Sequence, residues 1–263
     1  MSLHATDITV KLGTRAVLRG VSMTAQAGRL TAIIGPNGSG KTTLLRALTA
    51  ELRPASGRIT LNGADLTGLP PDVLARQRAV LPQHSALSFP FTAAEIIRIG
   101  LTSHPDAQTV GDALIAAALA QVGLPDYAGR LYQEMSGGEQ QRVQLARALV
   151  QVWQPVGADG PRWLMLDEPV SSLDIAHQLA VMRLAAAYAR RGGGVVAVMH
   201  DLNLTAMFAD HVLLMQNGSA LAEGPPDEVL TDSLLTSAYN CTLRTRCAPA
   251  QGAWLLPQGA MVM

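Results

Sequence analysis

Apolar and polar residues alternate near the start of the chain. The apolar positions lie on either side of a turn-like Leu12-Gly13-Thr14, with Ile8, Val10 and Leu12 on one face before it and Val17, Leu18, Val21 and Met23 after it. Such alternation is typical of half-buried strands, so the pattern predicts a pair of antiparallel strands. The apolar run from Leu30 to Ile34 follows and predicts a further strand.

The apolar period then changes to that of a helix. Leucines recur at helical spacing over residues 42–52, which predicts a helix that Pro54 ends. The elements predicted next are an alternating strand at 57–61 that runs into the hairpin signal Asn62-Gly63, a polar helix at 72–78 and a short strand at 79–81.

From Ser85 to Gln133 the chain is rich in Ala, Leu and Ile in helical periods, which are clearest at 93–97 and 112–122. Prolines interrupt these periods and separate the helices. We therefore expect one α/β domain, residues 1–263, with an inserted helical subdomain. Its approximate bounds are 85–158, and the core with an N-terminal antiparallel β subdomain takes 1–84 and 159–263.

Further strands and helices are predicted in the second half of the chain. These are a helix from Ser136 to Val150, a buried parallel strand at 163–166, a strand at 195–199, a hairpin within 212–224, short helices at 226–230 and 234–239, and one or two edge strands near Trp254 to Pro257. The expected fold class is therefore α/β, with a mixed or largely parallel sheet flanked by helices.

The composition of the chain limits the classes of function that it can be expected to have. The chain has 263 residues and a formal net charge of zero, so no general electrostatic attraction to nucleic acid is expected. Apolar residues make up 48% and charged residues 15%, which favours a surface that partners cover. No uncharged apolar run reaches the ~18 residues of a transmembrane helix, and the N-terminus lacks a signal-peptide pattern. Cys241 and Cys247 are predicted to be free thiols.

The stretch GPNGSGKTT, after the apolar run 30–34, is the first segment whose residues indicate a binding site. It fits G-x-x-x-x-G-K-[ST] and comprises Gly35, Pro36, Asn37, Gly38, Ser39, Gly40, Lys41, Thr42 and Thr43. Glycines let backbone N–H groups close on phosphate oxygens, and the following helix presents its positive end. Lys41 would neutralise the outer phosphates and Thr42 would bind Mg²⁺. A plain strand-to-helix turn is the alternative.

A second anion site is predicted where another helix begins, at Ser136, Gly137, Gly138 and Glu139. The hydroxyl and the first-turn N–H groups of such a helix point the same way. Because this site lacks a lysine and a metal ligand, we interpret it as half of a composite site completed by a second copy of the chain. A simple N-cap at Ser136 would explain the serine without needing both glycines.

Carboxylates follow the predicted buried strand 163–166, at the end where ligands bind in open α/β sheets. Asp167 is expected to hold Mg²⁺ and Glu168 to accept a proton from the attacking water or orient it. His200 ends the next strand and could contact the γ-phosphate. Gln83, at the end of strand 79–81, could bind the metal or position water.

The chain resembles the ATP-binding subunit of ABC transporters over nearly its whole length. The resemblance lies in the order and spacing of GPNGSGKT, Gln83, SGGEQQR, LMLDE, SSLD and His200. The resemblance implies a P-loop NTPase core and a homodimer that sandwiches two ATP, with Asp174 of SSLD at the nucleotide. It also implies two membrane permease subunits above the dimer, which contact the helical subdomain and the loop after Gln83. Leu12 stands where the family often has an aromatic residue against adenine.

Residues 80–92 and the lengthened segment 151–162 are similar to the bacterial haem-importer ATPases. This resemblance implies haem import at the cytoplasmic face of the inner membrane, with a periplasmic haem-binding protein in the complex. Ferric-siderophore and cobalamin importers share the architecture and remain alternatives. The departures from the family pattern are Met135, Glu139 and Val170, and none removes a phosphate or metal ligand.

A different class of protein uses the same ATPase core on DNA or ribosomes. The DNA-repair members insert long coiled coils, and no heptad run occurs here. The translation factors carry two phosphate loops in one chain, whereas this sequence has one. Together with the neutral charge, these features favour the transporter subunit.

Overall fold

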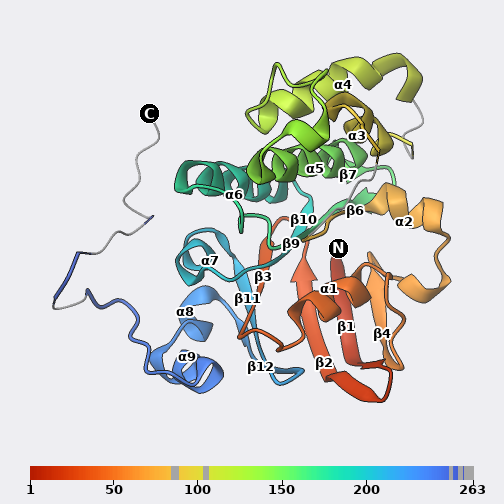
Figure 1. Ribbon diagram of the computed structural model, residues 1–263. Coiled ribbons are helices and arrows are strands. Elements are labelled where there is room, and N and C mark those ends of the chain that lie inside the picture. The colour runs from red at the N-terminus through yellow and green to blue at the C-terminus, as the bar shows by residue number, and fades with distance from the viewer. Residues whose placement is uncertain (84–88, 103–106, 249–250, 254–256, 258–263) are drawn as a thin grey trace.

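A six-stranded sheet forms the centre of the molecule (Figure 1). The structure, a computed structural model, describes residues 1–83, 89–102, 107–248, 251–253 and 257, with the backbone alone for 107–110. The strand order is β12-β11-β3-β10-β9-β6. The bounds are β3 (Leu30–Ile34), β6 (Arg78–Leu81), β9 (Trp163–Asp167), β10 (Gly194–Val198), β11 (His211–Gln216) and β12 (Ser219–Gly224). All neighbours are parallel except the hairpin β11–β12, so the predicted mixed sheet is confirmed.

A second, antiparallel sheet has the order β2-β1-β4-β5. Its strands are β1 (Ser2–Leu12), β2 (Arg15–Gln26), β4 (Ser56–Leu61) and β5 (Ala64–Asp65). The hairpin signal is confirmed, since Asn62 and Gly63 both have positive φ, at 51° and 88°. The prediction that Leu12 shares the inner face with Ile8 and Val10 is wrong. Register shifts on both sides of Val10 turn Leu12 outward, where it is 49% exposed.

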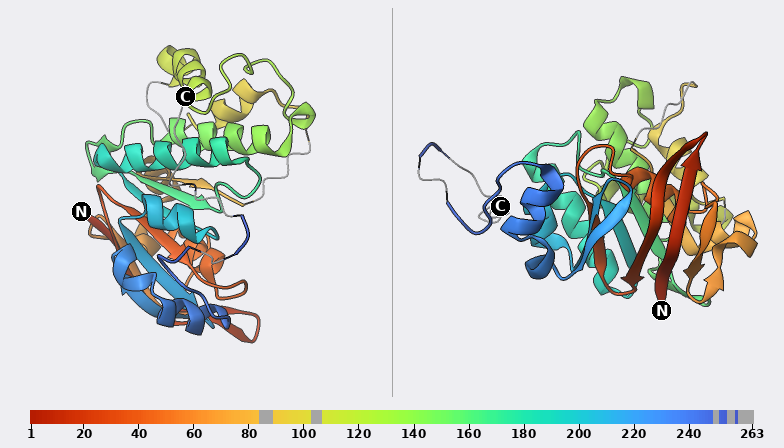
Figure 2. Two further views of the ribbon diagram at one scale, coloured as in Figure 1. Left: turned by 90° about the vertical axis from the view of Figure 1, so that its left-hand side faces the viewer. Right: turned by 90° about the horizontal axis from the view of Figure 1, so that it is seen from below.

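Helix α1 (Lys41–Leu48) lies between the two sheets, as Figure 2 shows. Leu44, Leu45 and Leu48 are buried in one apolar cluster with residues from both sheets. The helix ends before the predicted Leu52, because Ala50 adopts a left-handed φ of 59° and the N–H groups after it bond back to the Arg46 carbonyl. This turn, rather than Pro54, terminates the helix.

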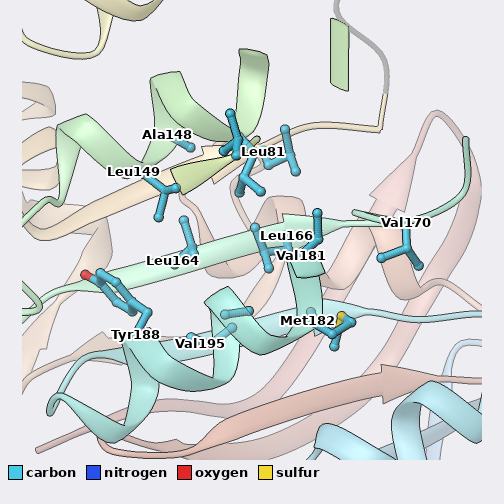
Figure 3. Packing of buried hydrophobic residues seen from close by; sticks show 14 of the residues in the cluster. Leu81, Ala148, Leu149, Leu164, Leu166, Val170, Val181, Met182, Tyr188 and Val195 are labelled. Atoms are coloured by element: carbon cyan, nitrogen blue, oxygen red, sulfur yellow. The ribbon is translucent and has the colours of Figure 1, made fainter. Parts of the chain in front are cut away.

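The opposite face of the six-stranded sheet is covered by α5 (Gly137–Gln151), α6 (Ile175–Arg190) and α7 (Leu202–Phe208). All residues of β9 are buried, as predicted for a parallel strand with helices over it. Figure 3 shows side chains of α5 (Ala148 and Leu149) and α6 (Val181, Met182 and Tyr188) around Leu164 and Leu166 of this strand. This packing holds the carboxyl end of β9 in place.

The remaining elements surround this framework (Figure 1). They are η1 (Leu66–Gly68), α2 (Pro71–Gln77), α3 (Ala93–Ile99), α4 (Ala107–Gln121), η2 (Tyr132–Glu134), β7 (Val156–Gly157), β8 (Gly160–Pro161), α8 (Pro226–Val229) and α9 (Asp232–Tyr239). The edge strands predicted near Trp254 lie outside the described residues. Cys241 and Cys247 are exposed free thiols, as expected. Within the described part of the chain, no helix is both long enough and apolar enough to cross a membrane.

Candidate functional site

The segment 35–40 joins β3 to α1 as a tight loop. Gly35, Gly38 and Gly40 all have positive φ, at 143°, 76° and 102°. A Cβ on Gly35 would lie 2.2 Å from the Met215 carbonyl oxygen, and one on Gly40 would lie 2.7 Å from Leu18 Cδ2. Only glycine fits these two positions, because β2 and β11 hold the loop from both sides.

Lys41 folds over this loop. Its Nζ donates to the carbonyl oxygens of Gly35, at 2.8 Å, and Pro36, at 3.0 Å. Burial lowers the pKa of the ammonium group, and the nearby carboxylates of Glu168 and Asp167 oppose that shift. A cation held by neutral carbonyls in a buried site gains when phosphate oxygens replace them. The side chain is therefore placed to exchange its loop partners for an anion.

Asp167 ends β9 and is 5% exposed. Its Oδ1 accepts a hydrogen bond from Thr42 Oγ1 at 3.1 Å, so two of the predicted metal ligands lie in contact. Burial raises the pKa of Asp167, and Glu168 raises it further. A nearby cation would stabilise this carboxylate, and hydroxyl, carboxylate and amide oxygens are the donors that Mg²⁺ prefers. Thr42, Asp167 and Gln83 therefore fit the ion.

A metal ion would need further ligands here. Among the residues that the structure describes, no cluster of three or more His, Cys, Asp or Glu groups could hold a metal. Mg²⁺ in such sites keeps waters and takes phosphate oxygens as ligands. The donor set therefore suits a metal–nucleotide complex better than a metal alone.

Glu168 has a left-handed backbone, with φ at 50°. Its N–H donates to the Val198 carbonyl at 3.2 Å, and its own carbonyl accepts from Gln141 Nε2 at 3.0 Å and Ser171 Oγ at 3.2 Å. A non-glycine residue in this region is strained by about 1–2 kcal/mol, and such strain is concentrated at functional sites. These bonds hold the Glu168 backbone in place at the carboxyl end of β9.

His200 follows β10, and its Nε2 lies 2.5 Å from Glu168 Oε1. The neighbouring Asp201 caps α7 by accepting from the N–H groups of Asn203 and Leu204. This cap fixes the chain directly after His200. Because β9 and β10 are adjacent parallel strands, their carboxyl ends bring the acid and the imidazole together.

These groups meet around a cavity of about 580 Å³. Its lining residues are Val17, Asn37, Gly38, Gly40, Lys41, Thr42, Thr43, Gln83, Glu168 and His200. The structure thus brings together most of the residues predicted for phosphate, metal and catalysis. Gly35, Pro36 and Ser39 belong to the loop but do not line the cavity, and Asp167 lies next to the lining through its hydrogen bond from Thr42. Val17 was not predicted, and Leu12 is absent from the lining.

The segment 135–142, which we call the signature segment, lies elsewhere. Ser136 caps α5, its Oγ accepting from Glu139 N at 3.3 Å, while Glu139 Oε2 accepts from Ser136 N at 2.7 Å. Ser136, Gly137, Gly138 and Glu139 do not line the cavity of their own chain. The N-cap interpretation is therefore confirmed. The composite site stays a prediction, since only a second copy could bring these groups to the phosphates.

Asp174 also acts as a helix cap and lies outside the cavity. It caps α6 by accepting from His177 N at 2.9 Å, and its carboxylate contacts the His177 ring. These bonds lower the pKa of Asp174. Its predicted place beside a nucleotide therefore also depends on a second chain.

The sequence interpretation missed supporting residues as well as Val17. Gln141 holds the Glu168 carbonyl, His177 holds Asp174, and Tyr127 contacts Glu139. Gln141 lies inside a recognised motif, so its position carried a signal. Nothing in the spacing of Tyr127 or Val17 indicates their contacts.

Comparison with known proteins places these features in context. A family model described as "ABC transporter" matches residues 18–171. The "Hemin import ATP-binding protein HmuV" of Roseobacter denitrificans is 56% identical over 261 residues, 99% of either chain. The protein of the same name from Jannaschia sp. (strain CCS1) is 58% identical over 256 residues, 97% of this chain and 94% of the relative.

A solved structure supports the fold. The chain is similar to the crystal structure of a nucleotide-free ATP-binding cassette from an ABC transporter, with a TM-score of 0.76 and 26% identity. The likeness covers 91% of this chain and 99% of the solved one. The predicted P-loop NTPase fold class, with its mixed sheet and flanking helices, is thereby confirmed.

Proposed function

The chain belongs to the ABC transporter family, and from this premise we propose that it is the ATP-hydrolysing subunit of an importer that moves haem across the bacterial inner membrane. The convergence of Lys41, Thr42, Glu168 and His200 on one cavity, with Asp167 bonded to Thr42 behind it, carries the ATPase part of the proposal. Haem is proposed as the cargo because the chain is similar, over almost its full length, to proteins named for hemin import.

The proposed reaction begins with ATP phosphates bound over the loop 35–40. Lys41 Nζ leaves the loop carbonyls for the phosphates, and N–H groups at the start of α1 donate to them. Thr42, Asp167 and Gln83 would hold Mg²⁺, which when bound supplies charge neutralisation at the phosphates. Glu168 accepts a proton from the attacking water, and His200 orients that carboxylate and reaches toward the γ-phosphate.

The site is completed by a second copy in this proposal. Two chains face head to tail, so that Ser136, Gly137 and Gly138 of one approach the ATP on the other. The N-terminus of α5 favours negative charge, and its glycines allow close approach. Glu139 and Asp174, which take part in the caps of α5 and α6, would lie at the same edge of the site. Binding then closes the homodimer, and hydrolysis reopens it.

The dimer would lie below two permease subunits. The permeases would contact the helical subdomain, residues 85–158, and the loop after Gln83. The loop residues 84–88 lie outside the described residues. Phe89 beside them is 68% exposed and packs edge to face with Phe91. The subunit would lie at the cytoplasmic face of the inner membrane, with the periplasmic haem-binding protein reached through the permeases. No nucleic-acid partner is proposed.

The cargo is tested with the reconstituted transporter. We expect haem-loaded binding protein to stimulate ATP hydrolysis by about tenfold over the unloaded protein, because loaded binding protein favours the closed ATPase dimer. Siderophore-loaded and cobalamin-loaded proteins serve as matched controls and are expected to give no stimulation. Stimulation by either of these alone would contradict haem and favour the alternative importers.

Base recognition gives a separate prediction. Val17 is the aliphatic residue in the cavity lining, and Leu12, which is exposed at the end of β1, takes the position where the family often has an aromatic residue against adenine. Replacing Leu12 by tyrosine is expected to lower the KM for ATP by about tenfold, since aromatic stacking contributes about 1–3 kcal/mol per base. Steady-state kinetics with ATP and GTP measure this change, and Lys11→Tyr on the neighbouring strand position is the control. An unchanged KM in Leu12→Tyr would place the base elsewhere.

A further inference from the structure

Tyr127 lies in the connection between α4 and α5 and makes a contact that the proposed function does not use. Its hydroxyl donates to Glu139 Oε1 at 2.5 Å. The Arg130 guanidinium lies over the Tyr127 ring, 4.3 Å from the centroid. The ring is thus held from one side by a cation while its hydroxyl reaches the first turn of α5.

Both oxygens of Glu139 are engaged by this arrangement. Oε1 accepts from Tyr127, and Oε2 accepts from the Ser136 N–H at 2.7 Å. The Tyr127 hydrogen bond, followed by those to Ser136, lowers the pKa of Glu139 to about 2. The carboxylate is therefore ionised at neutral pH and fixed in a single orientation.

A carboxylate in the first turn of α5 would oppose the proposed role of the α5 N-terminus, which is to bind phosphate. The α5 N-terminus is an anion site, and a free glutamate in the first turn could swing over the Gly137 and Gly138 N–H groups. There it would occupy donors and repel the γ-phosphate of a second copy. Tyr127 holds Oε1 to the side, which leaves these donors open.

The connection that carries Tyr127 is bonded to the start of α3 and to Phe91 just before it. Ala93 N donates to Arg130 O at 2.9 Å, Ala94 N to Ala128 O at 3.0 Å, and Tyr132 N to Phe91 O at 2.8 Å. A displacement of residues 91–94 would therefore move the Tyr127 hydroxyl. These residues belong to the helical subdomain, which the proposed function assigns to contact with the permease.

We propose that Tyr127 is a positioning residue for the signature segment, acting through Glu139, an inference that rests on the composite site of the proposed function. Its hydroxyl keeps the Glu139 carboxylate off the phosphate position. Its attachment to residues 91–94 lets a permease movement change that orientation. Loss of the Tyr127 hydroxyl would therefore affect the site that forms in the dimer, while the single chain would bind ATP as before.

The test measures ATP-dependent dimerisation in a Glu168→Gln parent, by light scattering across an ATP titration. Adding Tyr127→Phe is expected to weaken dimerisation by at least about tenfold, because the freed Glu139 carboxylate would occupy the α5 donors and repel the γ-phosphate. The affinity of the single chain for a fluorescent ATP analogue, measured under dilute conditions, is expected to change by less than about twofold.

A matched control and a rescue separate positioning from folding. Tyr132→Phe removes a nearby buried hydroxyl that accepts from Gln144 Nε2 at 3.3 Å, and it is expected to leave dimerisation intact. Adding Glu139→Gln to Tyr127→Phe removes the misplaced charge and is expected to restore dimerisation to within about twofold of the parent.

Different failures point to different proposals. Equal dimerisation with and without Tyr127→Phe would overturn the positioning role and leave the composite site standing. The same conclusion would follow from an equal loss in Tyr132→Phe or from no rescue by Glu139→Gln. A Glu168→Gln parent that stays monomeric at saturating ATP would overturn the composite site, and the positioning role with it.

Discussion

Replacing Glu168 by glutamine is expected to slow ATP hydrolysis by about 10²- to 10⁴-fold, the usual contribution of a general base. The change keeps the size of the side chain and removes its ability to accept a proton. Glu168 lines the cavity, and its Oε1 faces His200 Nε2. Steady-state phosphate release measures the loss.

ATP binding should survive in this variant, because Lys41 and the loop 35–40 are unchanged. Hydrolysis is what reopens the proposed dimer, so Glu168→Gln should accumulate as a closed dimer with ATP. Glu51→Gln is the control, since Glu51 is exposed in the turn after α1 and is outside the cavity lining. Ordinary turnover by Glu168→Gln would show that another group accepts the proton.

Replacing Lys41 by alanine is expected to weaken ATP binding by about 10²-fold or more. A charge-assisted contact to phosphate is worth about 1.5–3 kcal/mol on its own, and a buried site strengthens it. The Gly35 and Pro36 carbonyls that Lys41 now holds would also lose their donor. Titration with a fluorescent ATP analogue measures the affinity, and circular dichroism confirms that the variant is folded.

The sequence offers a matched control for this change. It contains two lysines, and the other, Lys11, is exposed near the end of β1. Lys11→Ala removes the same charge from the chain and is expected to leave affinity within about twofold. Tight ATP binding by Lys41→Ala would contradict the role of the loop 35–40 as the phosphate site.

Local patterns predicted most elements correctly. Alternation located β1 and β2, Asn62-Gly63 located a hairpin, and the apolar run before Asp167 located β9. These signals depend on neighbours in sequence, where steric and hydrogen-bonding preferences act directly. The end of α1 was mispredicted because a left-handed Ala50 closes the helix before Pro54. Such a turn depends on packing around it and leaves no mark in the apolar period.

In the candidate site, too, some features were predicted from the sequence and others were not. The residues of the phosphate loop, Asp167, Glu168 and His200 were predicted because their types and order match a chemistry. The outward direction of Leu12 was not predicted, because bulges in β1 shift its register. Val17 could not be predicted either, since a valine in an alternating strand signals only burial. The subdomain bounds and the role of the signature segment stay predictions.

The sequence by itself determined the family and the fold class and predicted the reacting groups, because these follow from short motifs in a set order. Only the tertiary structure decided which groups touch. Thr42 bonds to Asp167 and Glu168 to His200 because β9 and β10 end beside the loop before α1. Tyr127 reaches Glu139 because α5 starts beside the preceding connection. Contacts between distant segments depend on the packing of whole elements, which no local pattern of residues specifies.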